Sequence, residues 1–379
     1  MGLAVLENLD QPSAAVVSAE GSRQDFFNFS REELAALLQE RFGASSYRST
    51  QLFQWVYRQG VRDLALMSNL AKEFRDDLKD FFHFPLPPIV DRQISSDGTR
   101  KYLFELEHGS NIESVMIKQP QRMTLCVSSQ VGCGMACAFC RTGTMGFHRN
   151  LSTSEIVRQV LGVIEDAKNF DDMFQNIVFM GMGEPLHNYD GVVRAVKILT
   201  DPQGLAIPPR KITISSVGLV PAIKKFGESG VDANLAISLN ATTDEVRSQI
   251  MPINKAYPIR VLLETLKGIP AKRRKKITME YVMLAGVNDS DADMRRLPRL
   301  VEGLPVKINL IPYNENAGLG FKTPAVDQIH AWQDYLTQRG LNTTIRWSKG
   351  QDIDAACGQL AVNKVGERPK RRVAAQPSL

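Results

Sequence analysis

Apolar positions in the first part of the chain recur at intervals of three and four residues, which is the period of an amphipathic helix. The clearest series begins with Ser30 and Glu33, spaced as in a capping box, and ends at Gly43. The same spacing predicts helices over residues 47–57 and 64–82. This pattern indicates a small helical domain.

Changes of pattern divide the chain further. A proline-rich run ends the helical pattern near residue 84, and alternating segments that turn at Asp97-Gly98 and His108-Gly109 follow it. We therefore predict five parts: a flexible tail over 1–25, a helical module over 26–84, a β-rich connector over 85–122, a core over 123–350 and a C-terminal segment over 351–379.

Within the core, short β-rich runs alternate with amphipathic helical stretches. The predicted strands lie at 124–128, 176–182, 211–217, 233–239, 277–284 and 306–312. The predicted helices lie at 153–168, 190–200, 219–228, 258–268, 292–302 and 325–339. This alternation predicts the α/β class, with a parallel sheet and crossover helices arranged as an open sheet or a partial barrel. Ligands in such folds bind at the carboxyl ends of the strands.

Composition is that of an ordinary soluble protein, because hydrophobic residues make up 43% and charged residues 23% of the 379 positions. No stretch is apolar long enough to span a bilayer, and residues 1–20 lack the basic start of a signal peptide, so we expect a cytoplasmic protein. Five cysteines, an odd number, favour metal binding or catalysis over a disulfide framework. The net charge of +5 is compatible with a polyanionic partner.

Three of the cysteines lie close together, at Cys133, Cys137 and Cys140. Structural zinc sites usually take four protein ligands, often in C-x-x-C pairs, and no such pair or nearby His completes one here. Iron-sulfur cubanes also normally take four cysteines, so three leave one iron open for a ligand. A structural zinc site and three buried cysteines remain the alternatives.

The C-x-x-x-C-x-x-C spacing, with Phe139 before the last cysteine, resembles the radical SAM superfamily. The resemblance implies a partial (β/α)6 barrel, similar to a TIM barrel, and a [4Fe-4S] cluster. The cluster's open iron would chelate the amino and carboxylate groups of S-adenosylmethionine and deliver an electron that releases a 5'-deoxyadenosyl radical.

Polar or flexible residues follow several predicted strands, where a barrel places its ligand contacts. The second strand ends in a segment containing Gly183 and Glu184, which in the superfamily binds the methionyl amine. Glycine allows close approach of the backbone, and a carboxylate accepts hydrogen bonds from an ammonium group. The remaining candidates for cofactor binding are Ser215, Ser238, Leu239, Asn240 and Asn314.

The wider sequence resembles the RlmN type of RNA adenine methyltransferase from about residue 26 to 360. The likeness is carried by TLCVSSQVGC (124–133), GMGEPL (181–186), PINK (252–255), KINLIP (307–312) and AACGQL (355–360). It implies methylation of carbon 2 of an adenosine in 23S rRNA, at the peptidyl transferase centre, and of the adenosine 3' of the anticodon in tRNA. Asn240 stands where some members have His.

The same resemblance implies roles for three residues outside the cysteine triplet. Cys357 would take a methyl group from one S-adenosylmethionine, and a second molecule would supply the radical, so that each turnover uses two. Glu113 would accept a proton from the RNA adduct, and Cys126 would release the product by forming a disulfide with Cys357. Without the resemblance, the residue types alone predict that Cys126 and Cys357 are each a small buried hydrophobic residue. They predict that Glu113 is a solvent-exposed strand residue.

Several regions are candidates for RNA contact. Basic runs lie at 272–276 and 364–372, although charge runs are usually just solvated. The helical module adds a further set: Arg48, Trp55, Tyr57, Arg58 and Arg62. We expect a monomer that receives electrons from a flavodoxin-like donor. The alternatives are carbon-8 methylation, as in the Cfr type, and a non-catalytic RNA-binding protein with a structural metal.

Overall fold

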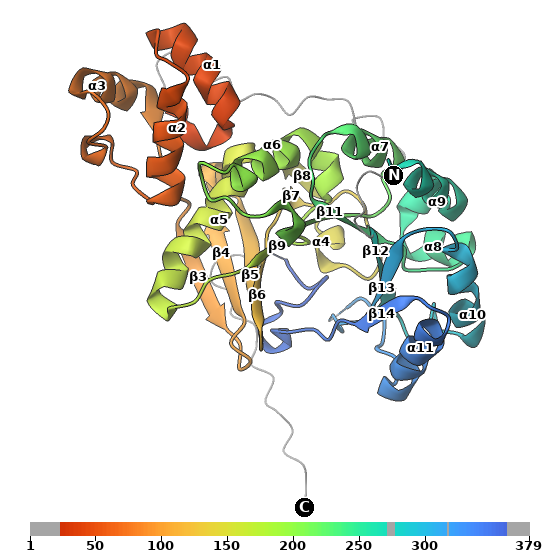
Figure 1. Ribbon diagram of the computed structural model, residues 1–379. Helices are drawn as coiled ribbons and strands as arrows, with labels where there is room; N and C mark the ends of the chain where they lie inside the picture. The colour runs from red at the N-terminus through yellow and green to blue at the C-terminus, as the bar shows by residue number, and fades with distance from the viewer. Residues whose placement is uncertain (1–22, 271–276, 317, 362–379) are drawn as a thin grey trace, which may run out of the picture.

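Figure 1 shows a computed structural model of the chain, in which residues 23–270, 277–316 and 318–361 are described. The basic runs at 272–276 and 364–372, and the predicted tail up to residue 22, lie outside these described residues.

The helical module contains α1 (Arg31–Phe42), α2 (Tyr47–Phe53) and α3 (Lys72–Phe81). The capping box predicted at the start of α1 is present, with Ser30 and Glu33 each accepting from the other's backbone N–H. The second predicted helix is confirmed, because a π-helical turn continues α2 to Arg58. The prediction of one continuous helix over 64–82 is wrong: a 3-10 turn and α3 are separated there.

Asn69 accounts for that interruption. Its carbonyl oxygen accepts a hydrogen bond from Gln51 Nε2 and its side-chain oxygen accepts one from Trp55 Nε1. These contacts turn the chain between Met67 and Leu70, both of which are buried. A polar residue that bonds to a neighbouring helix therefore ends the helical pattern that the apolar spacing predicts.

The module begins before residue 26, where we predicted the tail to end. Strand β1 (Gln24–Asp25) pairs in parallel with β2 (Phe82–His83), so both ends of the module lie together. Phe26 packs among Phe53 and Phe82, with ring centroids 6.1 and 5.6 Å away. These contacts form an aromatic core of the module's own, to one side of the main body (Figure 1).

The main body is built on one ten-stranded sheet. Its order is β14-β13-β12-β11-β10-β9-β6-β5-β4-β3. The strands are β3 (Ile89–Ile94), β4 (Arg100–Glu105), β5 (Asn111–Gln119), β6 (Arg122–Cys126), β9 (Asn176–Phe179), β10 (Ile212–Ser216), β11 (Asn234–Ser238), β12 (Ile277–Met283), β13 (Val306–Pro312) and β14 (Asn342–Ile345). Pairing is antiparallel from β3 to β6 and parallel from β6 to β14.

All six predicted core strands are present, and the sheet extends past them on both sides. The connector strands β3–β5 continue the core sheet through the pairing of β5 with β6, so the predicted boundary at 122 falls at the start of a strand of the shared sheet. On the other side β14 was not predicted, because its sequence, Asn-Thr-Thr-Ile, is short and mostly polar. Such a sequence suits an edge strand, which pairs on one side only.

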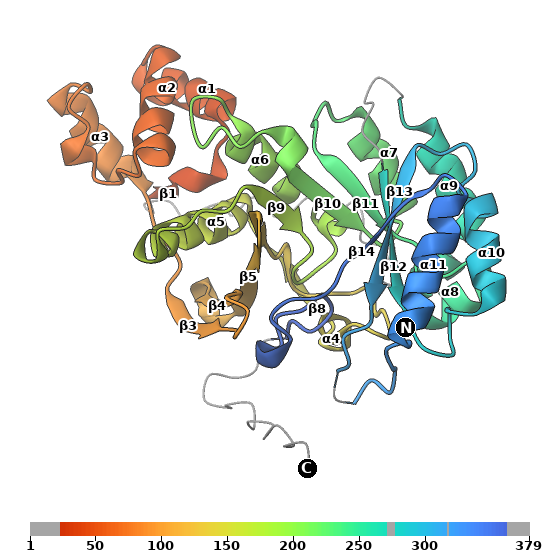
Figure 2. The ribbon, with the colours of Figure 1, turned by 60° about the horizontal axis from the view of Figure 1, so that its bottom comes forward.

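The predicted helices are also present, and they lie along the outside of the curved sheet (Figure 2). They are α5 (Thr153–Ala167), α6 (Tyr189–Thr200), α7 (Val220–Glu228), α9 (Ile259–Gly268), α10 (Asp291–Leu300) and α11 (Val326–Gln338). An additional helix, α8 (Asp244–Ile250), precedes α9. The α/β partial barrel is thus confirmed. In the described part of the chain, no helix has the length and apolar character needed to cross a bilayer.

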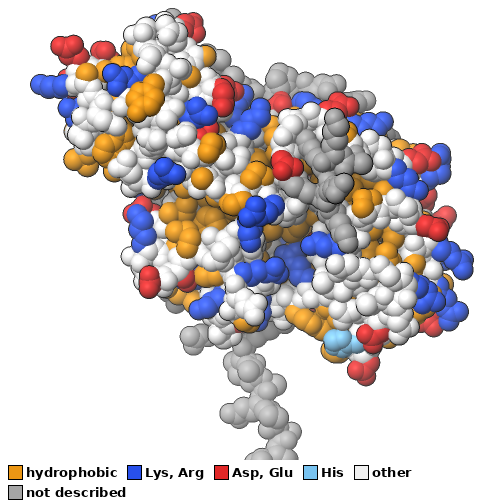
Figure 3. All heavy atoms as spheres, in the orientation of Figure 1, with side chains coloured by type: hydrophobic (Ala, Val, Ile, Leu, Met, Phe, Trp, Pro, Cys, Tyr) orange, Lys and Arg blue, Asp and Glu red, His pale blue; other side chains and the backbone are white. Residues whose placement is uncertain are grey.

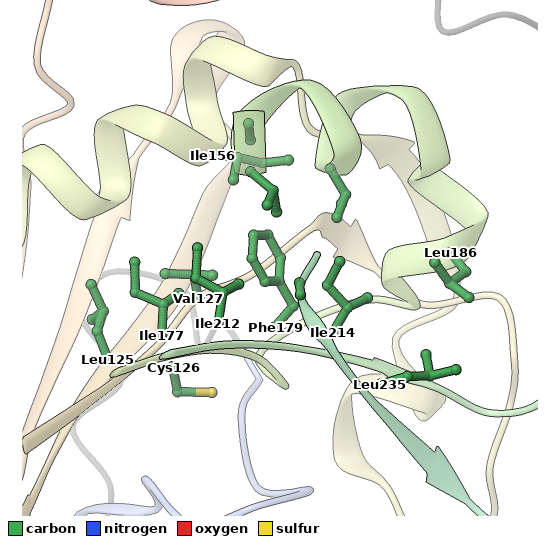
Figure 4. Close-up of a cluster of buried hydrophobic side chains, with 14 of the residues drawn as sticks. Leu125, Cys126, Val127, Ile156, Ile177, Phe179, Leu186, Ile212, Ile214 and Leu235 are labelled. Atoms are coloured by element: carbon green, nitrogen blue, oxygen red, sulfur yellow. The ribbon is translucent and has the colours of Figure 1, made fainter. Parts of the chain in front are cut away.

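Side chains from the parallel strands and the covering helices fill the space between them. Leu125, Val127, Ile177 and Phe179 point toward Ile156 of α5, and all five are buried (Figure 4). Successive residues of a strand face opposite ways. The side chain of Cys126 therefore points away from this core, to the other face of the sheet, as Figure 4 shows.

Candidate active site

Most of the residues predicted to form the site line a single cavity at the carboxyl ends of the parallel strands. Ten of them do so: Cys133, Cys137, Cys140, Gly183, Glu184, Ser215, Ser238, Asn240, Asn314 and Cys357. Three predicted residues are not part of its lining: Cys126, Glu113 and Leu239. The cavity therefore brings together segments that are more than two hundred residues apart in the sequence.

The three clustered cysteines lie on a tight loop between β7 (Gln130–Gly132) and the short helix α4 (Arg141–Thr144). The N–H of Cys140 donates to the carbonyl oxygen of Cys137 over 3.1 Å, and the N–H of Cys133 donates to Gly146 over 2.8 Å. Ala136 adopts a left-handed backbone conformation with φ of 51°. This folded loop turns all three thiols into the cavity.

Burial and mutual proximity disfavour the charged form of the thiols on this loop. Burial, together with the charges of Cys140 and Glu184, raises the pKa of Cys133 to about 12. Burial and the neighbouring thiols likewise raise the pKa of Cys137. Cationic iron stabilises thiolates that burial disfavours, so the donor set suits an iron-sulfur cluster. Among the described residues, no three Cys, His, Asp or Glu side chains surround a point suited to a single metal ion.

Glu184 is 2% exposed, and its carboxylate faces the cavity from the turn after β9. It accepts hydrogen bonds from the N–H of Val217 at 2.9 Å and from the N–H of Leu186 at 3.2 Å. Burial raises the pKa of Glu184 to about 7, and these hydrogen bonds limit the shift. A buried carboxylate in this position is suited to bind an ammonium group.

The glycines before Glu184 are needed for packing within the protein. A Cβ atom on Gly181 would lie 2.7 Å from the Val127 carbonyl oxygen, and one on Gly183 would lie 2.6 Å from Gln130 Cβ. Gly183 also has a φ of 103°, which disfavours other residues. We predicted that glycine serves close approach to a ligand. The structure shows in addition that both glycines allow the close approach of this turn to Val127 and Gln130, and both also line the cavity.

The other strand-end residues differ in what they contact. Ser215 donates to the Phe179 carbonyl oxygen over 2.6 Å, which joins neighbouring strands. Asn240, with φ of 56°, accepts a hydrogen bond from the N–H of Val282 at 2.8 Å. Leu239 is fully buried in the core, which is why it does not line the cavity.

Arg247 of α8 connects neighbouring strand ends through hydrogen bonds. The side chain is fully buried, and it donates to the carbonyl oxygens of Leu239 at 3.0 Å, Val217 at 2.7 Å and Ser238 at 3.1 Å. It also donates to Asn254 Oδ1 at 3.0 Å. Sequence analysis did not single out this residue, although it precedes the PINK segment.

The C-terminal segment carrying Cys357 closes one side of the cavity. Asn314 Nδ2 donates to the Cys357 carbonyl oxygen over 3.1 Å, and the N–H of Arg141 donates to the Gly358 carbonyl oxygen over 2.8 Å. Thr142 Oγ1 donates to the Leu360 carbonyl oxygen over 2.6 Å. The loop of the cysteine triplet therefore holds the segment of Cys357 directly.

Cys126 and Cys357 lie near enough for the charge of one to act on the other. Cys357 is exposed to the cavity that it lines, and other parts of the protein surround that cavity. Burial, together with the charge of Cys357, raises the pKa of Cys126 to about 12. Burial also raises the pKa of Cys357, while Arg346 opposes this rise. In the structure both cysteines are free thiols.

Glu113 on β5 is 5% exposed, contrary to the solvated position that its residue type alone suggests. Its Oε1 lies 3.3 Å from Lys101 Nζ, and its Oε2 has no hydrogen-bond partner. Burial raises the pKa of Glu113, and the charge of Lys101 opposes the rise.

Sequence analysis missed three charged residues at or beside the site: Lys101, Glu280 and Arg346. Glu280 and Arg346 line the cavity, with Arg346 Nη1 3.8 Å from Glu280 Oε2. Glu280 could have been identified from the sequence, because it lies in the middle of an apolar strand. Burying a charge is costly, so such a residue is a candidate for a functional role. Arg346 carried no such signal, since it follows the one core strand that the pattern did not indicate.

The predicted RNA-contacting residues of the helical module fall into two groups. Arg58 is exposed, while Arg62 and Trp55 are half-buried. Tyr57 is buried in the aromatic core and is therefore unavailable at the surface. A nearby groove is lined by further cations that sequence analysis did not name: Arg23, Lys72, Arg75 and Lys79.

Sequence comparison with family models gives two matches. Residues 127–297 match the radical SAM superfamily, and residues 24–83 match the ribosomal RNA large subunit methyltransferase N-terminal domain. Together they cover the helical module and most of the barrel.

Individual relatives match over nearly the whole chain. A protein of Geobacter sulfurreducens named dual-specificity RNA methyltransferase RlmN is 49% identical, over 89% of this chain and 91% of its own length. A protein of the same name from Cereibacter sphaeroides is 44% identical over 95% of both chains. A crystal structure of a radical SAM methyltransferase from Sphaerobacter thermophilus, 39% identical, superposes with a TM-score of 0.82 over 89% of this chain and 98% of that one.

Proposed function

Because the chain belongs to the RlmN family of the radical SAM superfamily, we propose that it methylates carbon 2 of adenosine in 23S rRNA and in tRNA. The rRNA target is the adenosine at the peptidyl transferase centre, and the tRNA target is the adenosine 3' of the anticodon. Carbon 2 of adenine lies between two ring nitrogens and is electron-poor. It cannot attack a methyl cation equivalent, so the reaction needs a carbon radical.

The cavity residues divide between cofactor binding and methyl transfer. Cys133, Cys137 and Cys140 would hold a [4Fe-4S] cluster, and Glu184 would accept hydrogen bonds from the methionyl ammonium group of S-adenosylmethionine. The bound cluster and S-adenosylmethionine supply the methyl group and a hydrogen-abstracting 5'-deoxyadenosyl radical, with two S-adenosylmethionine molecules used per turnover. Gly183, Ser215, Ser238, Leu239, Asn240 and Asn314 would complete the cofactor contacts.

The methyl group would be carried by Cys357. Its exposure in the cavity gives the thiol access to a methyl donor, and a thiolate is a good nucleophile. Loss of a hydrogen atom from the methyl group on the Cys357 sulfur makes a carbon radical, which adds to carbon 2 and joins the RNA to Cys357. Arg346 supports this role because its positive charge favours the thiolate.

Release of the product would use Glu113 and Cys126. Glu113 would accept the proton that carbon 2 loses, and the adduct would pass its unpaired electron back to the oxidised cluster. Cys126 then bonds to the sulfur of Cys357, the bond between that sulfur and the methylene carbon breaks, and the carbon takes up a proton to become the methyl group. The position of Cys126 supports this step, because its thiol points away from the hydrophobic core (Figure 4) and the charge of Cys357 raises its pKa.

The RNA surface would include the helical module and the face beside it. Lys and Arg side chains gather near the middle of the face shown in Figure 3, below the N-terminal helices, with few acidic side chains among them. Phosphate contacts made by such cations weaken as salt rises. The target adenine would leave its stack to enter the cavity. We further propose a cytoplasmic monomer with a flavodoxin-like electron donor.

The observation that carries the proposal is that Cys357 lines the same cavity as the cysteine triplet, with Cys126 near enough for the charge of Cys357 to raise its pKa. The test supplies S-adenosylmethionine with a CD3 group to the anaerobically reconstituted enzyme over many turnovers, followed by mass spectrometry of the nucleosides. We expect 2-methyladenosine with two deuterium atoms in the methyl group, since one is removed from the methylated cysteine. A CD3 product would contradict the radical route. An 8-methyl product would establish carbon-8 chemistry, and unmethylated RNA would favour a non-catalytic role.

A further inference from the structure

A buried ion pair lies between the sheet and the segment that carries Cys357, formed by Lys101 of β4 and Glu113 of β5. We propose that Lys101 is a positioning residue, which keeps Glu113 ionised and joined to the Cys357 segment so that Glu113 can take the proton from carbon 2. This inference rests on the proposed function, in which Glu113 is the proton acceptor.

The two side chains are placed by the register of the sheet. Lys101 pairs with Val115 and Leu103 pairs with Glu113 across β4 and β5. Glu113 is two residues from Val115, so it shares a face with Lys101 and is its diagonal neighbour. Lys101 Nζ lies 3.3 Å from Glu113 Oε1, with only 11% and 6% of the side chains exposed. The pair is therefore shielded from solvent.

Lys101 also reaches the C-terminal segment. Its Nζ donates to the carbonyl oxygen of Asp354 over 3.5 Å, three residues before Cys357. Asp354 has a left-handed backbone conformation with φ of 51°, and its carboxylate lies 3.8 Å from Arg141 Nη1. One ammonium group thus contacts both the proposed base and the turn that leads to the proposed methyl carrier.

The two oxygens of Glu113 are not equivalent. Oε1 is paired with Lys101, whereas Oε2 is buried without a hydrogen-bond partner. A buried acceptor left without a partner is uncommon in folded proteins and invites an explanation. Here the explanation is a role as the atom that receives the proton.

The ionisation of Glu113 depends on few groups. Burial raises its pKa, and the charge of Lys101 is the largest influence in the other direction. The charged groups that face it are Lys101 on β4 and Arg141 on α4, with the backbone N–H of Ala361 from the C-terminal segment. Without Lys101 the carboxyl would hold its proton to higher pH, and a protonated carboxyl cannot act as a base.

The step itself is a simple proton transfer. After the methylene carbon on Cys357 has added to carbon 2, the adduct would pass its unpaired electron back to the oxidised cluster, and the bond between carbon 2 and its hydrogen breaks. Its electron pair stays with the purine, and the proton moves to Glu113 Oε2. The ion pair with Lys101 leaves Oε2 free to receive it.

The test measures resolution of the covalent RNA adduct, in single turnover from pH 6 to 9, by denaturing gel. It uses the reconstituted full-length enzyme with Lys101→Met, Lys101→Arg and, as a matched control, Lys118→Met. Lys118 is an exposed lysine on the same sheet, on β5. Lys101→Gln, which retains a hydrogen-bond donor without charge, serves as the second uncharged variant if Lys101→Met does not fold.

We expect the uncharged variants to accumulate adduct and to resolve it about tenfold more slowly at neutral pH for each unit by which the pKa of Glu113 rises. Their pH profile for adduct resolution should move to higher pH. Lys101→Arg should restore the profile, and Lys118→Met should match the parent enzyme. An unshifted profile in both uncharged variants would overturn the inference.

A parallel sample of Cys126→Ala separates this inference from the proposed function. That variant should trap the adduct whatever the role of Lys101. If it traps adduct while the Lys101 variants resolve theirs as the parent does, only the inference fails. If no variant forms an adduct at any pH, the proposed function fails, and the role of Lys101 fails with it.

Discussion

Asn314 Nδ2 donates a hydrogen bond to the carbonyl oxygen of Cys357 over 3.1 Å, which joins the end of β13 to the loop of the proposed methyl carrier. Gln351, earlier in the same C-terminal segment, donates to Asn314 Oδ1 over 3.0 Å. Both ends of the Asn314 amide are therefore used to hold this segment. The residue that we predicted to contact S-adenosylmethionine already has a structural role at the cavity.

Replacing Asn314 by Ala should remove hydrogen bonds that hold the Cys357 segment in place, and it should leave the cluster site intact. Two hydrogen bonds of about 1 kcal/mol each would be lost, so we expect methylation of Cys357 to slow by about tenfold or more. Mass spectrometry of the intact protein measures the methylated fraction over time, and visible absorbance measures cluster content. Loss of the cluster together with the methyl group would show that Asn314 supports the whole cavity instead.

Cys357→Ala should abolish RNA methylation and leave cluster content unchanged. Cys357 lines the cavity but lies on a different segment from the three clustered cysteines, so its removal takes away the methyl carrier alone. Iron analysis and the product nucleosides measure the two quantities. Cys137→Ala is the matched control, which should lose the cluster. RNA methylation by cluster-loaded Cys357→Ala would refute the methyl-carrier mechanism.

Cys126→Ala should trap the protein on its RNA. The thiol of Cys126 is the partner that would release the sulfur of Cys357, so without it the carbon–sulfur bond stays intact. A denaturing gel after one turnover detects the covalent species, and double substitution of Cys126 and Cys357 should abolish it. Free, methylated RNA as the sole product of Cys126→Ala would assign that cysteine a structural role.

Arg247→Met should destabilise the fold by about 3 kcal/mol, since it leaves three carbonyl oxygens at the ends of two strands without their donor. Urea unfolding of the apoprotein measures the change. Arg260→Met is a suitable control, because its pair with Glu264 is exposed and such pairs contribute about 0 to 1 kcal/mol. Equal stability of the two variants would show that water replaces the guanidinium.

The parts of the fold that sequence analysis predicted share one physical origin. Each of the six core strands buries apolar side chains, and each helix between them buries an apolar stripe. The regular spacing of apolar residues in the sequence therefore predicts these elements. β14 is an edge strand with a mostly polar sequence, and its pairing depends on the presence of β13. The break at Asn69 depends on side chains of α2. Both are tertiary effects, which local periodicity does not contain.

Some residues of the site could likewise be assigned from the sequence, and others could not. The cysteine triplet, Glu184 and Cys357 could be assigned from sequence because spacing and resemblance identify them. Arg346, Lys101 and Arg247 could not, since a single basic residue in a sequence is most often solvated. Their positions follow from burial and from neighbours that the fold brings close. The reason for glycine at 181 and 183 was likewise visible only in the packing of this turn against Val127 and Gln130.

The last prediction concerns pH and Glu184. Its carboxyl has its pKa raised from an ordinary 4.5 to about 7 by burial. Below pH 4.5 the group is protonated in both the folded and the unfolded states, and its contribution to stability is fully present. As pH rises toward 7, the unfolded chain ionises first, so the apoprotein loses about 3 kcal/mol, and above 7 the loss is complete.

Glu184→Gln removes this dependence, because an amide does not titrate over the range. The free energy of unfolding in urea should therefore fall for the parent apoprotein between pH 5 and 7 relative to the variant, and the difference should be constant from pH 8. Glu245→Gln is the control, since Glu245 is exposed at the start of α8. A constant difference between Glu184→Gln and the parent across the whole range would mean that Glu184 is ionised throughout, held by the N–H groups of Val217 and Leu186.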